Sequence, residues 1–120
     1  MSNSSARRVA RIQGVYFLVT GVWPLMNRRT FEWVTGPKGD FWLAQTVGAL
    51  VASIGSALLL AEKRKRLTPE LEALAAGSAG ALALIDLVFV LRGRISRVYL
   101  ADAAIESTIV AGWMVARRSA

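Results

Sequence analysis

The sequence predicts an all-α fold: one domain, residues 1–120, in which four antiparallel transmembrane helices form a bundle with both termini in the cytoplasm. Three observations predict it. The 120-residue chain is 54% hydrophobic, which is more apolar surface than one soluble core of this size can bury. The apolar residues gather in four stretches, each close to the roughly 20 residues that cross a bilayer. No stretch alternates like a barrel strand, and lipid admits only helices and closed barrels.

The four expected helices are separated by connections that hold basic or turn-forming residues. The helices are expected at about 9–26, 42–61, 71–91 and 98–116, after a tail at 1–6. The tail is rich in serine, so we expect it to be disordered. The sequence shows no internal repeat, and the lipid bilayer is its expected surrounding.

The first stretch is the shortest, with Arg11 and Gln13 near its start and Pro24 near its end. It crosses the membrane only if Arg11 extends toward the interface. A signal peptide is the alternative, because basic residues precede the apolar segment. The following Asn27-Arg28-Arg29 lacks the small residues of a cleavage site, so a retained helix is favoured.

The distribution of lysine and arginine predicts the orientation. Nine lie in the two terminal segments and the second connection: Arg7, Arg8, Arg11, Lys63, Arg64, Lys65, Arg66, Arg117 and Arg118. Six lie in the first and third connections: Arg28, Arg29, Lys38, Arg92, Arg94 and Arg97. An even number of helices places the first group on one side, and the positive-inside rule makes that side cytoplasmic.

The first connection, residues 27–41, mixes aromatic, charged and turn-forming residues. Trp33 and Trp42 fit the aromatic belt found at membrane interfaces. Gly36-Pro37 is typical of a turn, and the glycine spacing does not fit a phosphate-binding loop. We expect an interfacial cap, and a lid over a site is the alternative.

Three acidic residues lie inside the apolar stretches: Asp86 in the third, and Asp102 and Glu106 in the fourth. Asp86 is six residues before Arg92 and Asp102 is five after Arg97, so both lie roughly 8–9 Å from the same membrane surface. The short third connection makes these helices neighbours, which predicts contact between Asp86 and Asp102. A charged carboxylate at the centre of a helix in lipid costs about 2.5–3.5 kcal/mol. The acids must therefore be paired, protonated or functional.

Other residues are expected to line a polar site around these acids in the outer half of the bundle. They are Gln45 of the second helix, Trp23 of the first, and Tyr99 and Trp113 of the fourth. Small residues spaced by four in the third helix allow close helix approach: Ala73, Gly77 and Ala81.

A structural hypothesis explains two of the acids. Arg92, Arg94 or Arg97 would fold onto Asp86 and Asp102, and the protein would be a non-catalytic accessory or assembly protein. Glu106 is one turn farther from these arginines, so an ion pair explains it poorly. A homo-oligomer is among the expected assemblies.

A functional hypothesis uses all three acids to bind or transport a cation, a proton or a small organic molecule, cationic or apolar. Glu106 and Asp102 would exchange a proton for a cation, as proposed for small four-helix drug exporters, although the first helix has Gln13 where that family has a glutamate. Trp23, Tyr99 and Trp113 would form aromatic walls. An intramembrane lipid-modifying enzyme that uses an acid pair is the other alternative, and no catalytic residue is assigned.

Several chemistries are disfavoured by composition. The chain has no cysteine and no histidine, which removes thiolate sites, disulfides and the commonest metal ligand and general base. No metal and no cofactor is expected. The formal net charge is +7, but the basic residues flank apolar stretches instead of forming a base-reading face, so no nucleic-acid partner is expected.

Gly21-Val22-Trp23-Pro24-Leu25-Met26, followed by Thr30-Phe31-Glu32-Trp33-Val34-Thr35-Gly36-Pro37-Lys38, resembles a string in small uncharacterised bacterial inner-membrane proteins. The four-helix layout resembles the DoxX-like group. This resemblance covers about a quarter of the chain and implies a multi-pass protein of the bacterial inner membrane. It implies no catalytic residue.

Overall fold

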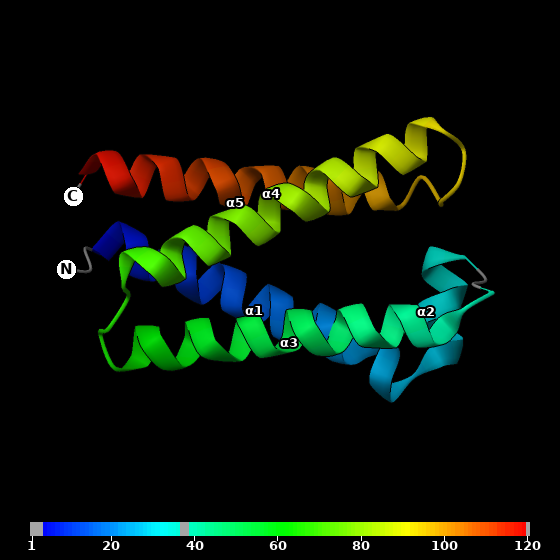
Figure 1. Ribbon diagram of the computed structural model, residues 1–120, viewed down its shortest axis with the longest axis horizontal. Helices are drawn as coiled ribbons and strands as arrows, with labels where there is room; N and C mark the ends of the chain where they lie inside the picture. The colour runs from blue at the N-terminus through cyan, green and yellow to red at the C-terminus, as the bar shows by residue number, and fades with distance from the viewer. Residues whose placement is uncertain (1–3, 37–38, 120) are drawn as a thin grey trace.

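The computed structural model describes residues 4–36 and 39–119, and these residues form helices and no strand. The helices are α1 Ser4–Met26, α2 Arg28–Thr35, α3 Phe41–Lys63, α4 Pro69–Leu91 and α5 Tyr99–Ser119 (Figure 1). The all-α prediction is therefore confirmed. By length and composition, α1, α3 and α4 could each cross a membrane. α5 is not among these helices, and Asp102 and Glu106 interrupt its apolar residues.

The long helices occupy the expected stretches of sequence, but their first and last residues differ from the predicted ones. α1 begins at Ser4, and Ala6 is buried in the core. The predicted disordered tail at 1–6 is thus wrong for residues 4–6, because packing of Ala6 stabilises the first turn; residues 1–3 lie outside the described residues. The first connection contains α2, which the sequence analysis did not predict.

α1 and α3 form an antiparallel pair that packs through glycines. A Cβ at Gly21 would lie 2.5 Å from the Gly48 carbonyl oxygen, and a Cβ at Gly55 would lie 2.7 Å from the Gly14 oxygen. Only glycine allows backbones to approach this closely. We call these four residues the glycine seam. It replaces the close approach predicted for Gly77, where an added Cβ would meet nothing within 4 Å.

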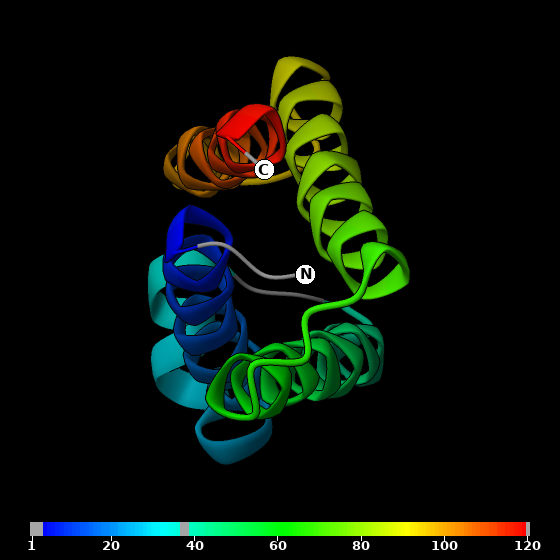
Figure 2. The same cartoon turned by 90° about the vertical axis from the view of Figure 1, so that its left-hand side faces the viewer.

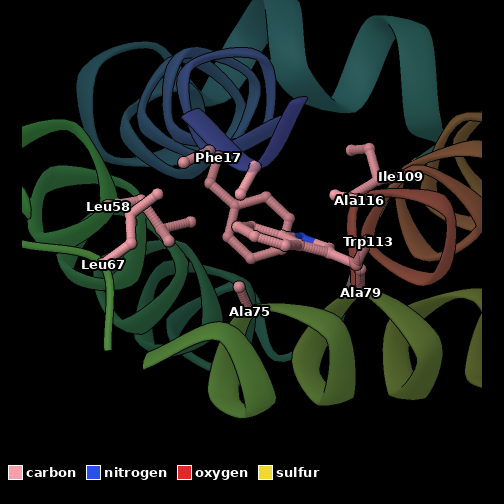
Figure 3. Packing of buried hydrophobic residues seen from close by; sticks show 10 residues of the cluster. Phe17, Leu58, Leu67, Ala75, Ala79, Ile109, Trp113 and Ala116 are labelled. Atoms are coloured by element: carbon pink, nitrogen blue, oxygen red, sulfur yellow. The ribbon is translucent and has the colours of Figure 1, made fainter. Parts of the chain in front are cut away.

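α4 and α5 form the second antiparallel pair, and α5 also packs against α1 (Figures 1 and 2). α3 and α4 make few contacts although they are joined directly. The core lies between the two pairs, where Phe17 of α1 and Trp113 of α5 point into the same space (Figure 3). Around them lie Leu58, Leu67, Ala75, Ala79, Ile109 and Ala116.

Local sequence signals mark the end of α3 and both ends of α4. The Thr68 side chain accepts a hydrogen bond from the Leu71 N–H at 3.2 Å, and Pro69 opens α4; both are favoured at helix starts. α4 is followed by Gly93 at φ +69° and α3 by Lys65 at φ +57°. In both places the N–H of the following residue donates a hydrogen bond back to a carbonyl oxygen of the helix, which is the Schellman arrangement. Lysine there adopts a conformation that glycine adopts at lower cost.

One end of the molecule holds both described chain ends and the connection between α3 and α4 (Figure 1). There Glu62, which is buried, accepts hydrogen bonds from Arg11 at 2.7 Å and Arg7 at 3.4 Å. Arg11 therefore does extend to a helix end, where it forms an ion pair between α1 and α3. The opposite end holds α2 and the connection between α4 and α5.

Candidate functional site

The three acids predicted to form a site converge at the interface of α1, α4 and α5. Asp86 comes from α4, and Asp102 and Glu106 lie one turn apart on the inward face of α5. Asp86 is 6% exposed and Glu106 is 2% exposed, while Asp102 is half-buried. We call these three side chains, together with Tyr16 of α1, the acid cluster.

Side-chain contacts through Asp102 link the three helices. The Tyr16 hydroxyl donates to Asp102 Oδ1, and the Asp86 and Asp102 carboxyl groups lie close enough to interact. The predicted contact between Asp86 and Asp102 is thus confirmed.

Glu106 lies beside this network, and its buried oxygen Oε1 makes no hydrogen bond. It interacts electrostatically with Asp102, and also with Asp86 and Tyr16 through the cluster. Glu106 Oε1 and Asp86 Oδ2 are both buried without a hydrogen-bond partner. An isolated buried charge is so costly that such groups are neutralised or paired. A proton on each of these carboxyl groups would remove that cost.

The arginines predicted to neutralise the acids do not reach them. Arg92, Arg94 and Arg97 are exposed in and beside the connection between α4 and α5. Within residues 4–36 and 39–119, the ion pairs join Arg7 and Arg11 to Glu62 and Arg28 to Glu32. Asp102 lies in the first turn of α5, where Tyr16 of α1 contacts it, and Asp86 and Glu106 are buried between the helices, whereas the arginines lie at the surface.

Trp113 is buried as predicted, but it belongs to a separate hydrogen-bonded group. Its indole Nε1 donates to Gln13 Oε1 at 2.7 Å, and Gln13 Nε2 donates to the Ala75 carbonyl at 2.8 Å. Gln13 is fully buried. This second polar group joins the same three helices about two turns from Glu106, and its role is in packing.

The remaining predicted wall residues are dispersed. Trp23 donates from Nε1 to the Thr30 hydroxyl at 2.9 Å and packs edge-on against Phe31, so it faces α2. Tyr99 is half-buried in the first turn of α5. Gln45 is half-buried on α3, the long helix that makes few contacts with α4.

The first connection forms a cap over the end of α1 and α3. The α2 N-cap is Asn27, which accepts from the Thr30 N–H at 3.1 Å. Phe31 packs between Trp23 and Phe41, and the Arg28 guanidinium lies 4.6 Å from the Phe41 ring centre. Trp33 is 85% exposed. This arrangement fits the predicted cap with an outward aromatic anchor; residues 37–38 of the predicted turn lie outside the described residues.

A shallow apolar depression lies on one face of α1 beside the acid cluster, and its lining residues all come from α1: Arg11, Ile12, Val15, Tyr16 and Val19. The depression is widely open at the surface, and Tyr16 belongs both to it and to the acid cluster.

Two residues of these polar groups, Gln13 and Tyr16, were not assigned to the site from the sequence. They are three residues apart in an apolar stretch, the spacing that places two side chains on one helix face. That spacing was an available signal. Within the described segments, no group of three or more His, Cys, Asp or Glu side chains could hold a metal ion. No family model, curated protein or solved structure matches this chain, so the geometry of the acid cluster carries the functional argument.

Proposed function

We propose that the chain is an integral membrane protein in which α1, α3, α4 and α5 all cross the bilayer. α5 has 21 residues, which gives a length of about 31 Å and matches the hydrocarbon core. Its two acids face α1 and α4 instead of lipid, which removes the main objection to insertion. The excess of basic residues at the end that holds both termini supports a cytoplasmic location for that end.

The proposed location is the bacterial inner membrane. It rests on the resemblance of the first connection and its flanking segments to a string in small bacterial inner-membrane proteins, and of the four-helix layout to the DoxX-like group.

The acid cluster is proposed to bind a proton and to exchange it for a monovalent cation. One observation carries this proposal: two buried carboxyl groups have unpartnered oxygens, and no ion pair among the described residues involves the cluster. Held protons neutralise the cluster at the least cost. A cation that enters would replace one proton, which leaves to solvent, so the net charge of the site is unchanged.

Thermal stability measured against pH tests this function. The groups facing Glu106 are Asp102 on its own helix, Asp86 on α4 and Tyr16 on α1. These groups are carboxylic acids and one phenol. A native state that keeps them protonated therefore binds more protons at neutral pH than the unfolded chain does. Stability should then fall as pH rises through the neutral and alkaline range.

The informative variant is Glu106→Gln, which keeps shape and removes one titrating group. We expect its stability to depend less steeply on pH than that of the wild type. Glu70→Gln is the matched control, because Glu70 is exposed in the first turn of α4 and should leave the slope unchanged. Identical slopes for wild type and Glu106→Gln would refute proton binding at Glu106.

A structural role is the second candidate, because Asp102 joins α1 to α5 through Tyr16 and α4 to α5 through Asp86. In that case the cluster only holds the helices together. Asp102→Asn distinguishes the two roles: a structural cluster predicts a large loss of stability at every pH, whereas a proton site predicts a changed pH dependence.

A further inference from the structure

One end of the molecule carries exposed basic side chains from three segments of the chain. It is the end that holds both described chain ends and the connection between α3 and α4, and Figure 2 shows it facing the viewer. The exposed basic residues lie at the start of α1, at the end of α3 with the following connection, and at the end of α5. They are Arg8, Lys63, Arg64, Lys65, Arg66, Arg117 and Arg118. We call these seven side chains the basic face.

The acidic residues of the same end do not neutralise the basic face. Glu62 is buried and already binds Arg7 and Arg11. Glu70 and Glu72 lie in the first turn of α4, where a negative charge interacts favourably with the helix N-terminus. The ion pairs of the described residues include no member of the basic face. Seven like charges therefore repel one another at this end, and they are complementary to an anionic surface.

The connection between α3 and α4 presents its basic side chains from an ordered backbone. The N–H groups of Arg64, Lys65 and Arg66 donate to carbonyl oxygens in the last turn of α3 at 2.8–3.1 Å. Directly after these residues, Leu67 is 4% exposed and packs in the core. Because the turn is already ordered, little backbone entropy is lost when its side chains bind a partner. Arginine and lysine side chains favour phosphate and carboxylate groups as partners.

The position of the basic face decides between these two kinds of anion. α1, α3 and α4 could each cross a membrane, and each has one end at the basic face (Figure 1). A face at the ends of membrane-crossing helices lies at the level of the lipid head groups, where phosphate is the abundant anion. Clusters of about four to eight basic residues beside such helices bind anionic lipids, and the consecutive residues Lys63–Arg66 form a cluster of this kind.

We propose that the basic face binds the phosphate groups of anionic phospholipids in the leaflet where it lies. This inference rests on the proposed membrane insertion, and it does not depend on proton exchange at the acid cluster. The bound phosphates offset the repulsion among the seven basic side chains.

The lipids that the full chain retains in native mass spectrometry test the inference. The protein is released from nanodiscs that contain phosphatidylglycerol and phosphatidylcholine in equal amounts with the same acyl chains, so that only the head group differs. We expect phosphatidylglycerol to be retained over phosphatidylcholine by about fivefold, the factor that one basic residue near an anionic surface supplies. A higher concentration of ammonium acetate during equilibration should reduce this preference.

Two triple variants locate the binding face. The first combines Lys63→Gln, Arg64→Gln and Arg66→Gln, which leaves Lys65 at its positive φ, and it should lower the preference at least about twofold. The matched control combines Arg92→Gln, Arg94→Gln and Arg97→Gln, which removes three exposed basic residues at the opposite end and should keep the preference. If circular dichroism shows that the first variant does not fold, the combination of Arg8→Gln, Arg117→Gln and Arg118→Gln tests the same face.

The results that overturn the inference differ from those that overturn the proposed function. Equal retention of the two lipids by the wild type, or an equal loss of preference in both triple variants, overturns lipid binding at the basic face. Loss of the preference when inorganic phosphate is added overturns it too, because the face would then bind small anions. Glu106→Gln should leave the lipid ratio unchanged, so proton binding fails or holds independently. A chain that does not enter nanodiscs refutes the proposed membrane insertion itself.

Discussion

The glycine seam predicts opposite effects for the same substitution at two places in the fold. A Cβ at Gly21 would lie 2.5 Å from the Gly48 oxygen and 2.6 Å from the Ala52 nitrogen. Ordinary contacts begin near 3.4 Å, and the clashing atoms are backbone, so α1 and α3 must move apart by roughly 1 Å along the seam. At Gly77 an added Cβ meets nothing within 4 Å.

The expected magnitudes follow from these distances. Overpacking costs about 2–3 kcal/mol where the backbone cannot yield, and exchanging glycine for alanine in a helix returns about 1 kcal/mol. Gly21→Ala should therefore lower the free energy of unfolding by about 1–2 kcal/mol. Gly77→Ala should raise it by up to about 1 kcal/mol. The contrast between the two variants is about 2–3 kcal/mol.

Unfolding in mixed micelles, followed by far-ultraviolet circular dichroism, measures this contrast. Both variants make the same chemical change in a long helix, so differences in helix propensity cancel. Equal stability of Gly21→Ala and Gly77→Ala would refute the close packing of α1 on α3. Gly48→Ala tests the same contact from the other side and should resemble Gly21→Ala.

Three further predictions concern local features and use the same unfolding assay. Lys65→Gly should raise stability by about 1 kcal/mol, because glycine adopts positive φ without strain; an unchanged value would contradict the Schellman end of α3. Trp113→Phe keeps the ring but leaves the buried Gln13 oxygen without its donor, so we expect a loss of about 1–3 kcal/mol; no loss would mean that Gln13 finds another donor. Glu62→Gln should lower stability more at low salt than at high salt, because the charged partner Arg11 is largely exposed; a loss that does not change with salt would argue against an ion pair.

The sequence was sufficient for the long helices because lipid-length apolar stretches and charged connections are strong, local signals. The depth of Asp86 and Asp102 could be estimated from their separation in sequence from Arg92 and Arg97. Their contact followed from the short connection between α4 and α5. Both inferences depend only on helix rise and chain connectivity.

Features that depend on the rotation of one helix against another could not be obtained in this way. Tyr16 meets Asp102 because α1 packs on both α3 and α5, and hydropathy does not specify that rotation. The same rotation turns Trp23 toward α2. The arginines were expected to fold inward because of their nearness in sequence, but the acids face the opposite direction, toward α1.

Close helix approach was expected from the small residues of α4, and it is not found at Gly77. These residues have the familiar spacing of four, yet an added Cβ at Gly77 meets nothing within 4 Å. The seam uses a spacing of seven, Gly14 with Gly21 on α1 and Gly48 with Gly55 on α3. Matching spacings on two consecutive helices would have been the better indicator.

The central claim is that the buried acid cluster holds protons at neutral pH, and infrared absorption of the protein in lipid tests it most directly. Protonated carboxyl groups absorb at a different infrared frequency from carboxylates, so the amount of protonated carboxyl can be compared between variants at one pH. We expect a protonated-carboxyl band at neutral pH that loses area in Glu106→Gln and keeps it in Glu70→Gln. A wild-type spectrum without that band would contradict the account, because three ionised carboxylates would then share the interface without a basic partner.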